Sequence, residues 1–521
     1  MPEYLHPGVY IEEIERGPVP IEGVPTSTAA FLGEAERGST TPQLVTSYKD
    51  YVRLYGSVFS QQKFLPYAVN GFFENGGKRA FICRVVGSAA VSASADFGSS
   101  FSVRAAGPGN WGNKVAVKIE PSKTKNADQS PVGFRMLLAY WNDVVPDDPF
   151  GAPKTRPSYS EVFEDLVANE SSPDYYAKRI PFIDLDKGDT NQGPTTSVLG
   201  ILVRNKGADP KVLPDNTTQT LLNGKDDPNA IGPNDFIGAT NDTRTEPQGL
   251  TALLLDPYRD VALVYAPGIT DKDTLLPIVN HCENQRYRFA VIDAPKGQSS
   301  TTSLDPRSMI ADSEYAAFYY PWIITSDPMT GARKLIPPGG NVLGVYARTD
   351  SERGVFKSPA NEILRGVLDL EYDLDDGTQD DLNPKGVNAI RSFPGRGIRV
   401  WGARTMSSDA LWKYVSVRRL FIFIERSIYE GTQWVVFEPN DDRLWARVID
   451  TIRLFLRTQW RLGALFGRTE QEAFFITCDR TTMTQDDILN GRLICEIGIA
   501  PVRPAEFVVF RIFQNTAEAQ S

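Results

Sequence analysis

Histidine is nearly absent from this sequence: only His6 and His281 occur among 521 residues. A catalytic triad, a histidine-rich metal site and general-base catalysis by histidine are therefore hard to assemble. His281 lies in a stretch with helical character, where we expect a packed or surface side chain rather than a ligand. The scarcity of histidine argues against an α/β enzyme of the histidine-dependent classes.

Cysteine and long apolar runs are also scarce. The four cysteines, Cys83, Cys282, Cys478 and Cys495, are too widely spaced for a CxxC pair or a disulfide framework, and we interpret them as reduced thiols. No run approaches the ~20 apolar residues of a membrane-spanning helix. The N-terminus shows neither the basic start nor the apolar core of a secretory signal. These absences predict a multidomain globular protein without direct membrane insertion.

Lysine is rare in the last quarter of the chain, where only Lys385 and Lys413 occur after residue 380 and the other cations are arginines. The formal net charge is -10, yet this last quarter is basic and the remainder is acidic. Arginine suits planar, bidentate contacts with carboxylates. No nucleic-acid recognition motif accompanies the arginines. We therefore expect an acidic protein surface as partner, and no nucleic acid.

Local patterns predict a mixed α/β fold. Ser47 is a suitable N-cap for a helix through Tyr55 that ends at Gly56. Other expected elements are a helix over 64–74, a strand over 80–86, and a βαβ unit with strands 261–265 and 289–292 around a helix over 273–284. Residues 101–249 are instead rich in turn formers with short apolar islands, which favours an inserted, exposed, mostly β domain.

Three motifs with possible cofactor chemistry do not support it. Gly107–Gly112 matches GxGxxG, but the following residues alternate like a strand, so we expect a turn into a β-hairpin. Gly76–Arg79 lacks the first glycine and the Ser or Thr of a phosphate-binding loop. The acidic run Asp369–Asp376 is typical of a solvated loop. The sequence predicts no metal, no cofactor and no catalytic residue.

A long amphipathic helix is expected from Asp441 to Leu462. Asn440 is the expected N-cap, and Asp441 and Asp442 lie at the positive end of the helix dipole. At about 100° per residue, five arginines share an arc of about 120°. They are Arg443, Arg447, Arg453, Arg457 and Arg461.

The opposite face of this helix is apolar and predicts a core contact through Leu444, Val448, Ile452, Phe455, Leu456 and Leu462, flanked by Trp445, Ile449 and Trp460. Leu454 is the one apolar residue on the charged face. The arginines could form an ordinary solvated surface. Alternatively, because we expect the charges to lack compensating acids, they could form a docking surface for a negatively charged partner.

Both ends of the chain resemble strands on extended linkers. The N-terminal strand comprises Val9, Tyr10, Ile11, Glu12, Glu13 and Ile14, followed by a Pro- and Gly-rich linker to residue 25. The C-terminal strand over 506–513 includes Glu506, Phe507, Val508, Val509, Phe510, Arg511 and Ile512. An apolar edge strand without a partner promotes aggregation, unless it is inserted into a neighbouring subunit's sheet.

Several stretches resemble the contractile tail sheath proteins of phages and phage-like injection particles. The most specific is Leu382–Thr405, LNPKGVNAIRSFPGRGIRVWGART, followed by GTQWVVFEPN at 431–440 and PAEFV at 504–508. Upstream, PGVYIEE at 7–13 and RGVFKSPAN at 353–361 are also similar to sheath motifs. Residues 100–250 carry little of the resemblance.

The resemblance implies a structural protein of a helical polymer, not an enzyme. Subunits would surround an inner tube in an extended metastable state, exchange terminal strands, and contract to drive the tube through a target envelope. It implies the arginine face as tube contact, and baseplate and tail terminator or cap proteins as further partners. Assembly is expected in the bacterial cytoplasm, in a phage tail or tail-like particle that is possibly released.

The implied organisation has four parts: an N-terminal strand and linker over 1–25, a middle α/β domain over 26–100 plus 250–360, the inserted β domain over 101–249, and an inner domain over 361–521. Two alternatives stay open from the sequence: a non-contractile filament or shell protein, and a monomeric α/β binding module.

Overall fold

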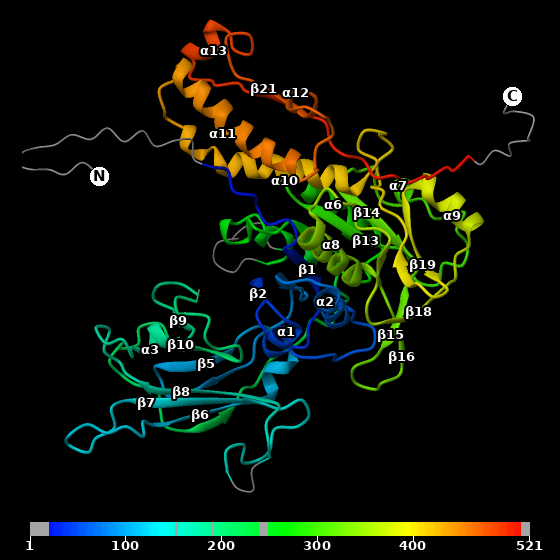
Figure 1. Ribbon diagram of the computed structural model, residues 1–521. Helices are drawn as coiled ribbons and strands as arrows, with labels where there is room; N and C mark the ends of the chain where they lie inside the picture. Colours follow the sequence, from blue (N-terminus) through cyan, green and yellow to red (C-terminus); the bar gives the residue numbers. More distant parts are fainter. Residues whose placement is uncertain (1–19, 152–154, 190, 239–247, 512–521) are drawn as a thin grey trace, which may run out of the picture. The chain divides into compact units, whose positions relative to one another are not determined.

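The computed structural model describes residues 20–151, 155–189, 191–238 and 248–511. It contains two compact units, which we call the C-terminal unit and the main unit. Within the described residues, the C-terminal unit comprises 20–24, 354–357 and 419–511, and the main unit comprises the rest. Both units combine helices and sheets (Figure 1), which confirms the mixed α/β fold class. The four-part division expected from the sequence stays a prediction.

A nine-stranded sheet organises the main unit, in the order β17-β20-β19-β14-β13-β12-β1-β3-β2. Neighbours from β19 to β3 are parallel, and the edge strands β2, β20 and β17 are antiparallel. The strands are β1 (Ala29–Gly33), β2 (Gln43–Val45), β3 (Ala80–Arg84), β12 (Leu263–Tyr265), β13 (Phe289–Asp293), β14 (Ala316–Tyr320), β17 (Glu362–Ile363), β19 (Val387–Phe393) and β20 (Gly397–Val400).

The central strands are buried on both faces, as expected of a parallel sheet covered by helices. Every residue of β1, β3, β13 and β14 is buried. Helices of this unit are α1 (Tyr48–Tyr55), α2 (Leu65–Glu74), α4 (Pro233–Ile237), α5 (Gly249–Ala252), α6 (Lys272–Gln285), α7 (Pro306–Met309), α8 (Gly339–Arg353) and α9 (Asp376–Leu382). Helices α2 and α8 pack together closely, since a Cβ at Gly340 would lie 2.4 Å from the Ala68 carbonyl oxygen.

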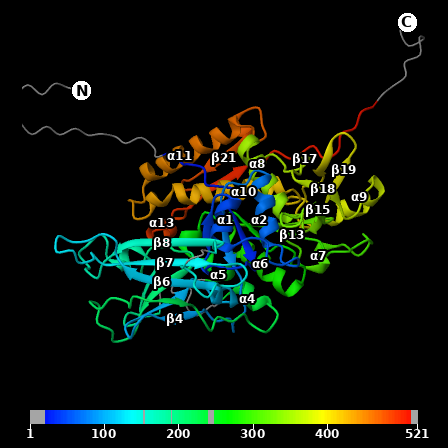
Figure 2. The ribbon, with the colours of Figure 1, turned by 90° about the horizontal axis from the view of Figure 1, so that it is seen from below.

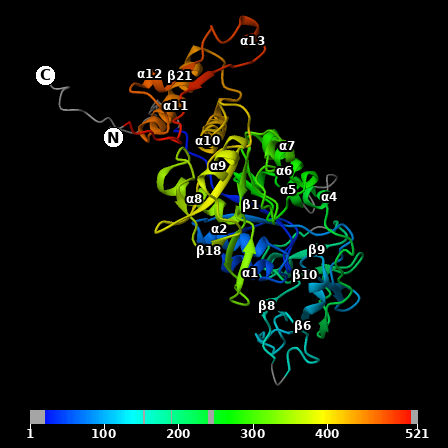
Figure 3. The same cartoon turned by 90° about the vertical axis from the view of Figure 1, so that its right-hand side faces the viewer.

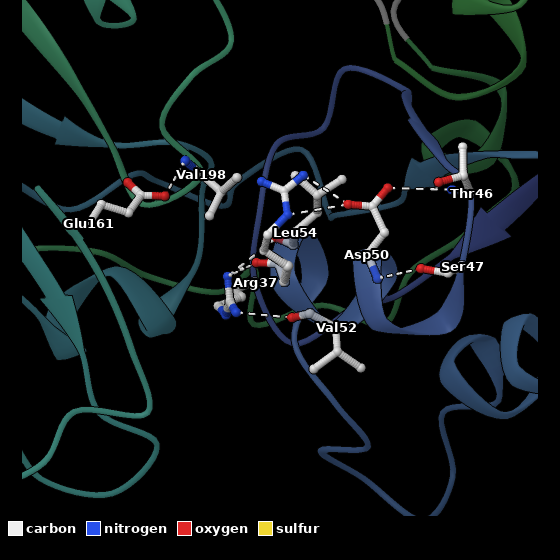
Figure 4. A network of polar contacts seen from close by, with 9 residues as sticks. Arg37, Thr46, Ser47, Asp50, Val52, Leu54, Glu161 and Val198 are labelled. Atoms are coloured by element: carbon white, nitrogen blue, oxygen red, sulfur yellow. Dashed lines mark hydrogen bonds and ion pairs between the residues drawn. The ribbon is translucent and has the colours of Figure 1, made fainter. Parts of the chain in front are cut away.

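Sequence patterns located most of these elements. Helix α6 connects the parallel neighbours β12 and β13, so the expected βαβ unit is confirmed. Ser47 caps α1 as predicted: its Oγ accepts a hydrogen bond from the Asp50 amide at 3.1 Å, and Gly56 ends the helix. Figure 4 shows a further contact that the pattern did not indicate, in which the Arg37 guanidinium donates to the Val52 carbonyl at 3.0 Å near the end of α1.

The inserted β region contains two four-stranded sheets, β4-β5-β10-β9 and β11-β6-β7-β8 (Figure 2). The strands are β4 (Ser94–Asp96), β5 (Phe101–Ala105), β6 (Val115–Pro121), β7 (Phe134–Tyr140), β8 (Tyr159–Leu166), β9 (Phe182–Asp184), β10 (Gly200–Arg204) and β11 (Thr218–Thr220), with a short helix α3 (Tyr176–Arg179). Strands β6, β7 and β10 coincide with the apolar islands of this stretch, which lie at 115–119, 136–140 and 198–203. The GxGxxG match leads through a 3-10 turn (Asn110–Lys114) into the β6–β7 hairpin, as expected.

Polar contacts attach this inserted region to the end of β1. The Tyr140 hydroxyl donates to Glu36 Oε1 at 2.7 Å, and the Arg37 guanidinium lies over the rings of Tyr140 and Tyr159 at 5.3 and 5.2 Å. Buried cation–π contacts of this kind are worth more than exposed ones. A third small sheet in the main unit consists of β15 (Ile323–Ser326), β16 (Arg333–Ile336) and β18 (Val367–Leu370).

The C-terminal unit consists of helices around a small hairpin. Helix α10 (Val415–Gly431) crosses the boundary between the units and is followed by α11 (Asp442–Arg461), α12 (Glu470–Ala473), β21 (Phe474–Thr477), α13 (Gln485–Leu489) and β22 (Glu496–Ile499). Figure 3 shows α11, α12 and β21 together. In the described part of the chain, no helix is long and apolar enough to cross a membrane.

Candidate functional site

Helix α11 begins one residue later than the sequence pattern indicated. The N-cap is Asp441, whose Oδ1 accepts hydrogen bonds from the Arg443 and Leu444 amides at 3.0 and 2.9 Å. Asn440 was therefore the wrong cap. Its side chain instead accepts from the Trp445 indole at 2.7 Å, and since Asn and Asp cap equally well, the sequence could not distinguish two adjacent candidates.

The apolar face of α11 forms the core of the C-terminal unit, as predicted. Leu444, Trp445, Val448, Ile452, Phe455 and Leu456 are buried, together with residues of α10 and the hairpin. Leu462 was wrongly assigned to this face: it follows the last helical residue and is 62% exposed. Leu454 is exposed among the arginines, as the helical projection indicated.

The arginine face of α11 is partly compensated, contrary to the sequence expectation. Asp450 lies inside the arginine arc, and its carboxylate pairs with Arg453 at 3.1 Å. Glu470 of α12 accepts from Arg457 Nε at 2.7 Å and lies 3.7 Å from Arg453 Nε. The hydrogen bond from Arg457 lowers the pKa of Glu470, so this carboxylate stays ionised. The middle of the arginine face is thus a network rather than a row of free charges.

The remaining arginines of this face are more available to a partner. Arg447 lies over the Trp434 ring at 4.6 Å and 3.7 Å from a carboxylate oxygen of Glu438. Arg443 and Arg461 are exposed and make no ion pair with the described residues. The two arginines without an ion pair therefore lie at the two ends of α11, about 27 Å apart at 1.5 Å per residue.

The C-terminal segment over residues 502–511 forms neither a helix nor a strand and contains the apolar run Phe507–Phe510. Phe507, Val508, Val509 and Phe510 are 72%, 68%, 77% and 84% exposed. The described residues therefore leave this apolar run largely uncovered. Its predicted pairing with another subunit stays a prediction, and Ile512 lies outside the described residues.

The N-terminal strand, Val9–Ile14, also lies outside the described residues. Of the linker that follows, Pro20–Val24 is described, and it contacts α10 instead of extending freely. Ile21 is 8% exposed, and the Val24 amide donates to Ser427 Oγ at 3.1 Å. Gly431 permits the approach, because a Cβ there would lie 2.6 Å from Ile21. This end of the linker is therefore anchored to the C-terminal unit.

A buried carboxyl group lies at the edge of the nine-stranded sheet where α/β enzymes bind substrates. Asp293, at the end of β13, accepts hydrogen bonds from the Tyr265 hydroxyl at 2.6 Å and from the Gly268 and Gly339 amides at 3.2 and 2.9 Å. Burial raises its pKa to about 6. Because its donors belong to three segments of the same unit, Asp293 holds the fold together.

The other groups considered from the sequence also have structural contacts. His281 Nε2 lies 2.6 Å from Arg288 Nη1, and burial together with that cation lowers the pKa of His281 to about 3. Within the acidic run, Asp375 caps α9 and Asp376 pairs with Arg391 at 2.8 Å. These side chains take part in packing, capping and ion pairs of the fold.

Comparison with known proteins identifies the family. Residues 243–406 match the phage tail sheath protein central domain, and residues 407–515 match the phage tail sheath C-terminal domain, together more than half of the chain. The chain belongs to the tail sheath family. The tail sheath protein of Burkholderia phage BcepMu is 28% identical over 303 residues, which are 54% of this chain and 62% of that protein.

Solved sheath structures share the fold over the whole length. The sheath complex of the extracellular contractile injection system PVC, in its contracted state, matches with a TM-score of 0.60 and 23% identity, covering all of both chains. A chain of the anti-feeding prophage baseplate matches with a TM-score of 0.56 and 24% identity, over 98% of this chain and all of that one. The sheath resemblance noted from the sequence is confirmed.

Proposed function

We propose that this chain is the repeating subunit of a contractile sheath, which polymerises around an inner tube and contracts to drive that tube through a target envelope. The observation that carries this proposal is the match of residues 243–515 to both sheath domains. It is supported by the fold shared with a sheath complex in the contracted state. Neighbouring copies, an inner tube, a baseplate and a terminal cap would be its partners.

In this function the energy for movement is stored in the packing of subunits, and the chain needs no catalytic site. That agrees with His281 and Asp293, whose polar atoms are occupied by contacts of the fold. Interfaces between packed subunits are bistable, so a lattice can change from one arrangement to another without chemistry. The subunits must, however, stay joined while they rotate.

Strand exchange would supply those joints. Phe507–Phe510 would add to a sheet of a neighbouring subunit, and Val9–Ile14 would do the same at the other end of the chain. Each main-chain hydrogen bond contributes a net ~0.5–1.5 kcal/mol, so a strand with five bonds contributes several kcal/mol. Because the donated strand leaves one subunit and enters the next, such contacts continue into a helical polymer.

The arginine face of α11 would contact the inner tube. Arg443 and Arg461, which are exposed at its ends and form no ion pair with the described residues, would meet carboxylates of the tube. Arg453 and Arg457 are held by Asp450 and Glu470 and would position the face. Ion pairs of exposed arginines are individually weak, which suits a sheath that must release the tube when it contracts.

Electron microscopy of the expressed chain tests the proposal. The full chain should form rings or striated tubes, and deletion of residues 506–521 should leave folded monomers. A matched control replaces Val144, an 81% exposed residue of the inserted region, with Ser and should still polymerise. If the full chain stays monomeric together with its tube and baseplate proteins, the sheath proposal fails and a monomeric binding module is favoured.

A further inference from the structure

The fold brings two of the four cysteines together. In the hairpin of the C-terminal unit, Thr477 of β21 pairs with Glu496 of β22. The next residue outward on each strand is a cysteine, Cys478 on one side and Cys495 on the other. The two thiols lie close enough for each to affect the pKa of the other. Sixteen residues separate the two cysteines in the sequence, so their proximity is not apparent from it.

The backbone geometry of the hairpin suits a disulfide. Opposite residues of antiparallel strands have Cα atoms about 4.5 or 5.5 Å apart, depending on whether they exchange hydrogen bonds. Both values fall inside the range of about 4.4–6.8 Å seen in disulfides. We propose that Cys478 and Cys495 are an oxidation site, at which a low-molecular-weight disulfide converts the two thiols into an intrachain disulfide that closes the loop 479–494.

The loop between the two cysteines is already ordered for this closure. Thr482 Oγ1 donates to the Ile494 carbonyl at 2.9 Å, one residue from Cys495. Two residues before Ile494, the Arg492 carbonyl accepts a hydrogen bond from Asn440 Nδ2 at 3.0 Å. Helix α13 is fixed by its Thr484 cap. Oxidation therefore requires rotation of two thiols and no refolding of the loop.

The two thiols have different access to a reagent. Cys478 is 2% exposed and belongs to the core, whereas Cys495 is only partly buried. The Cys495 thiolate would attack one sulfur of the small disulfide, forming a mixed disulfide and releasing one small thiol. The Cys478 thiolate then attacks the Cys495 sulfur and releases the second small thiol. The protein loses two electrons and two protons, which the reagent takes up.

The reaction should be slow, because the thiolate is the attacking species. Burial, with the neighbouring Cys478 thiol, raises the pKa of Cys495 to about 12. The other cysteines provide internal controls, since Cys83 and Cys282 are fully buried in the main unit and burial raises the pKa of each to about 12. This proposal is independent of the sheath proposal, because it concerns a single subunit.

The test uses the purified full chain with excess oxidised glutathione overnight, followed by acid quenching, alkylation and mass spectrometry without reduction. We expect a peptide pair linked through Cys478 and Cys495, unmodified Cys83 and Cys282, and a rise in the Tm of the C-terminal unit of roughly 5–10 °C that a reductant reverses. The variant Cys478→Ser should stop at a glutathione adduct on Cys495.

Two results would overturn the proposal. One is a stable glutathione adduct on Cys495 of the wild-type chain, as expected only for the Cys478→Ser variant. It would mean that the Cys478 thiol cannot reach the sulfur of Cys495. The other is a wild-type chain in which both thiols remain free under conditions that fully convert the added cysteine of a parallel Val144→Cys sample. Since the decisive sample is the wild-type chain, the result does not depend on whether a variant folds.

Discussion

Strand β14 and the segment Phe507–Phe510 have similar residues and opposite surroundings. Strand β14 reads AAFYY and is entirely buried between β13 and β19. The C-terminal segment reads FVVF, has strong β propensity, and is exposed on both faces. Apolar side chains left in water cost ~25 cal/mol per Å² relative to burial.

The difference shows that one chain contains two kinds of strand. The first completes a sheet inside the subunit, and its side chains determine whether the subunit folds. The second has no β partner among the described residues, and its side chains would determine whether subunits join. Substitutions in each strand should distinguish the two roles.

The largest effect is expected from making the C-terminal segment polar. Replacing Phe507, Val508, Val509 and Phe510 with Ser should abolish polymers in electron micrographs while the Tm of the subunit stays unchanged, because these side chains are exposed in the monomer. A large drop in Tm would mean that the segment packs on its own subunit and stabilises it, as β14 does.

The opposite outcome is expected in the buried strand. Phe318→Ala in β14 removes a fully buried ring and should destabilise the subunit by about 3–5 kcal/mol. Phe437→Ala is the matched control, because the Phe437 side chain is fully exposed and its loss should change stability by less than about 0.5 kcal/mol. Denaturant unfolding of the two variants measures the difference, and equal effects would refute the assignment of β14 as core.

Asp293 tests the interior of the same sheet through pH. Its pKa is about 6 in the folded protein and about 3.9 when unfolded, so the folded state binds the proton more tightly. The contribution of Asp293 to the free energy of unfolding is therefore largest below pH 4. It falls by about 3 kcal/mol in total as the pH rises through 6. Between pH 4 and pH 7 the free energy of unfolding of the wild type should fall by roughly 2 kcal/mol relative to that of Asp293→Asn, because about half of the unfolded carboxyl groups are already ionised at pH 4. If the difference in free energy of unfolding between the two proteins does not change with pH, the folded state keeps Asp293 ionised at both pH values.

The helices and strands of the main unit and the C-terminal segment were partly predictable from the sequence. Helix α1, helix α2, strand β3 and the βαβ unit were predicted because capping residues, glycine stops and apolar periodicity are local signals. The order of nine strands was not, because β19 joins β14 through contacts far apart in the chain. The C-terminal segment was predicted as a strand from its β propensity, and only the structure shows its exposure.

The candidate site on α11 was likewise predictable only in part. The arginine arc and apolar face of α11 follow from helical periodicity, and Asp450 could have been found on the same projection. Glu470 could not, since it reaches Arg457 from another helix. Likewise, only the register of β21 and β22 brings Cys478 opposite Cys495. Local chemistry was predictable, whereas pairs created by folding were not.

The smallest of the predicted effects concerns the exposed charges. Arg443→Glu with Arg461→Glu should weaken binding of the sheath subunit to its inner tube about tenfold at low salt and less at high salt, as expected of exposed charges. Lys206→Glu with Lys211→Glu, two exposed changes in the inserted region with the same change of net charge, is the control. Co-sedimentation with tubes measures the effect, and equal losses from both changes would remove α11 as the tube contact.

Cryo-electron microscopy of the assembled polymer would show directly whether subunits exchange strands. We expect Phe507–Phe510 to form a strand in the sheet of a neighbouring subunit, with main-chain hydrogen bonds across the subunit boundary. A polymer in which these residues lie against their own subunit, or remain uncovered, would contradict this expectation.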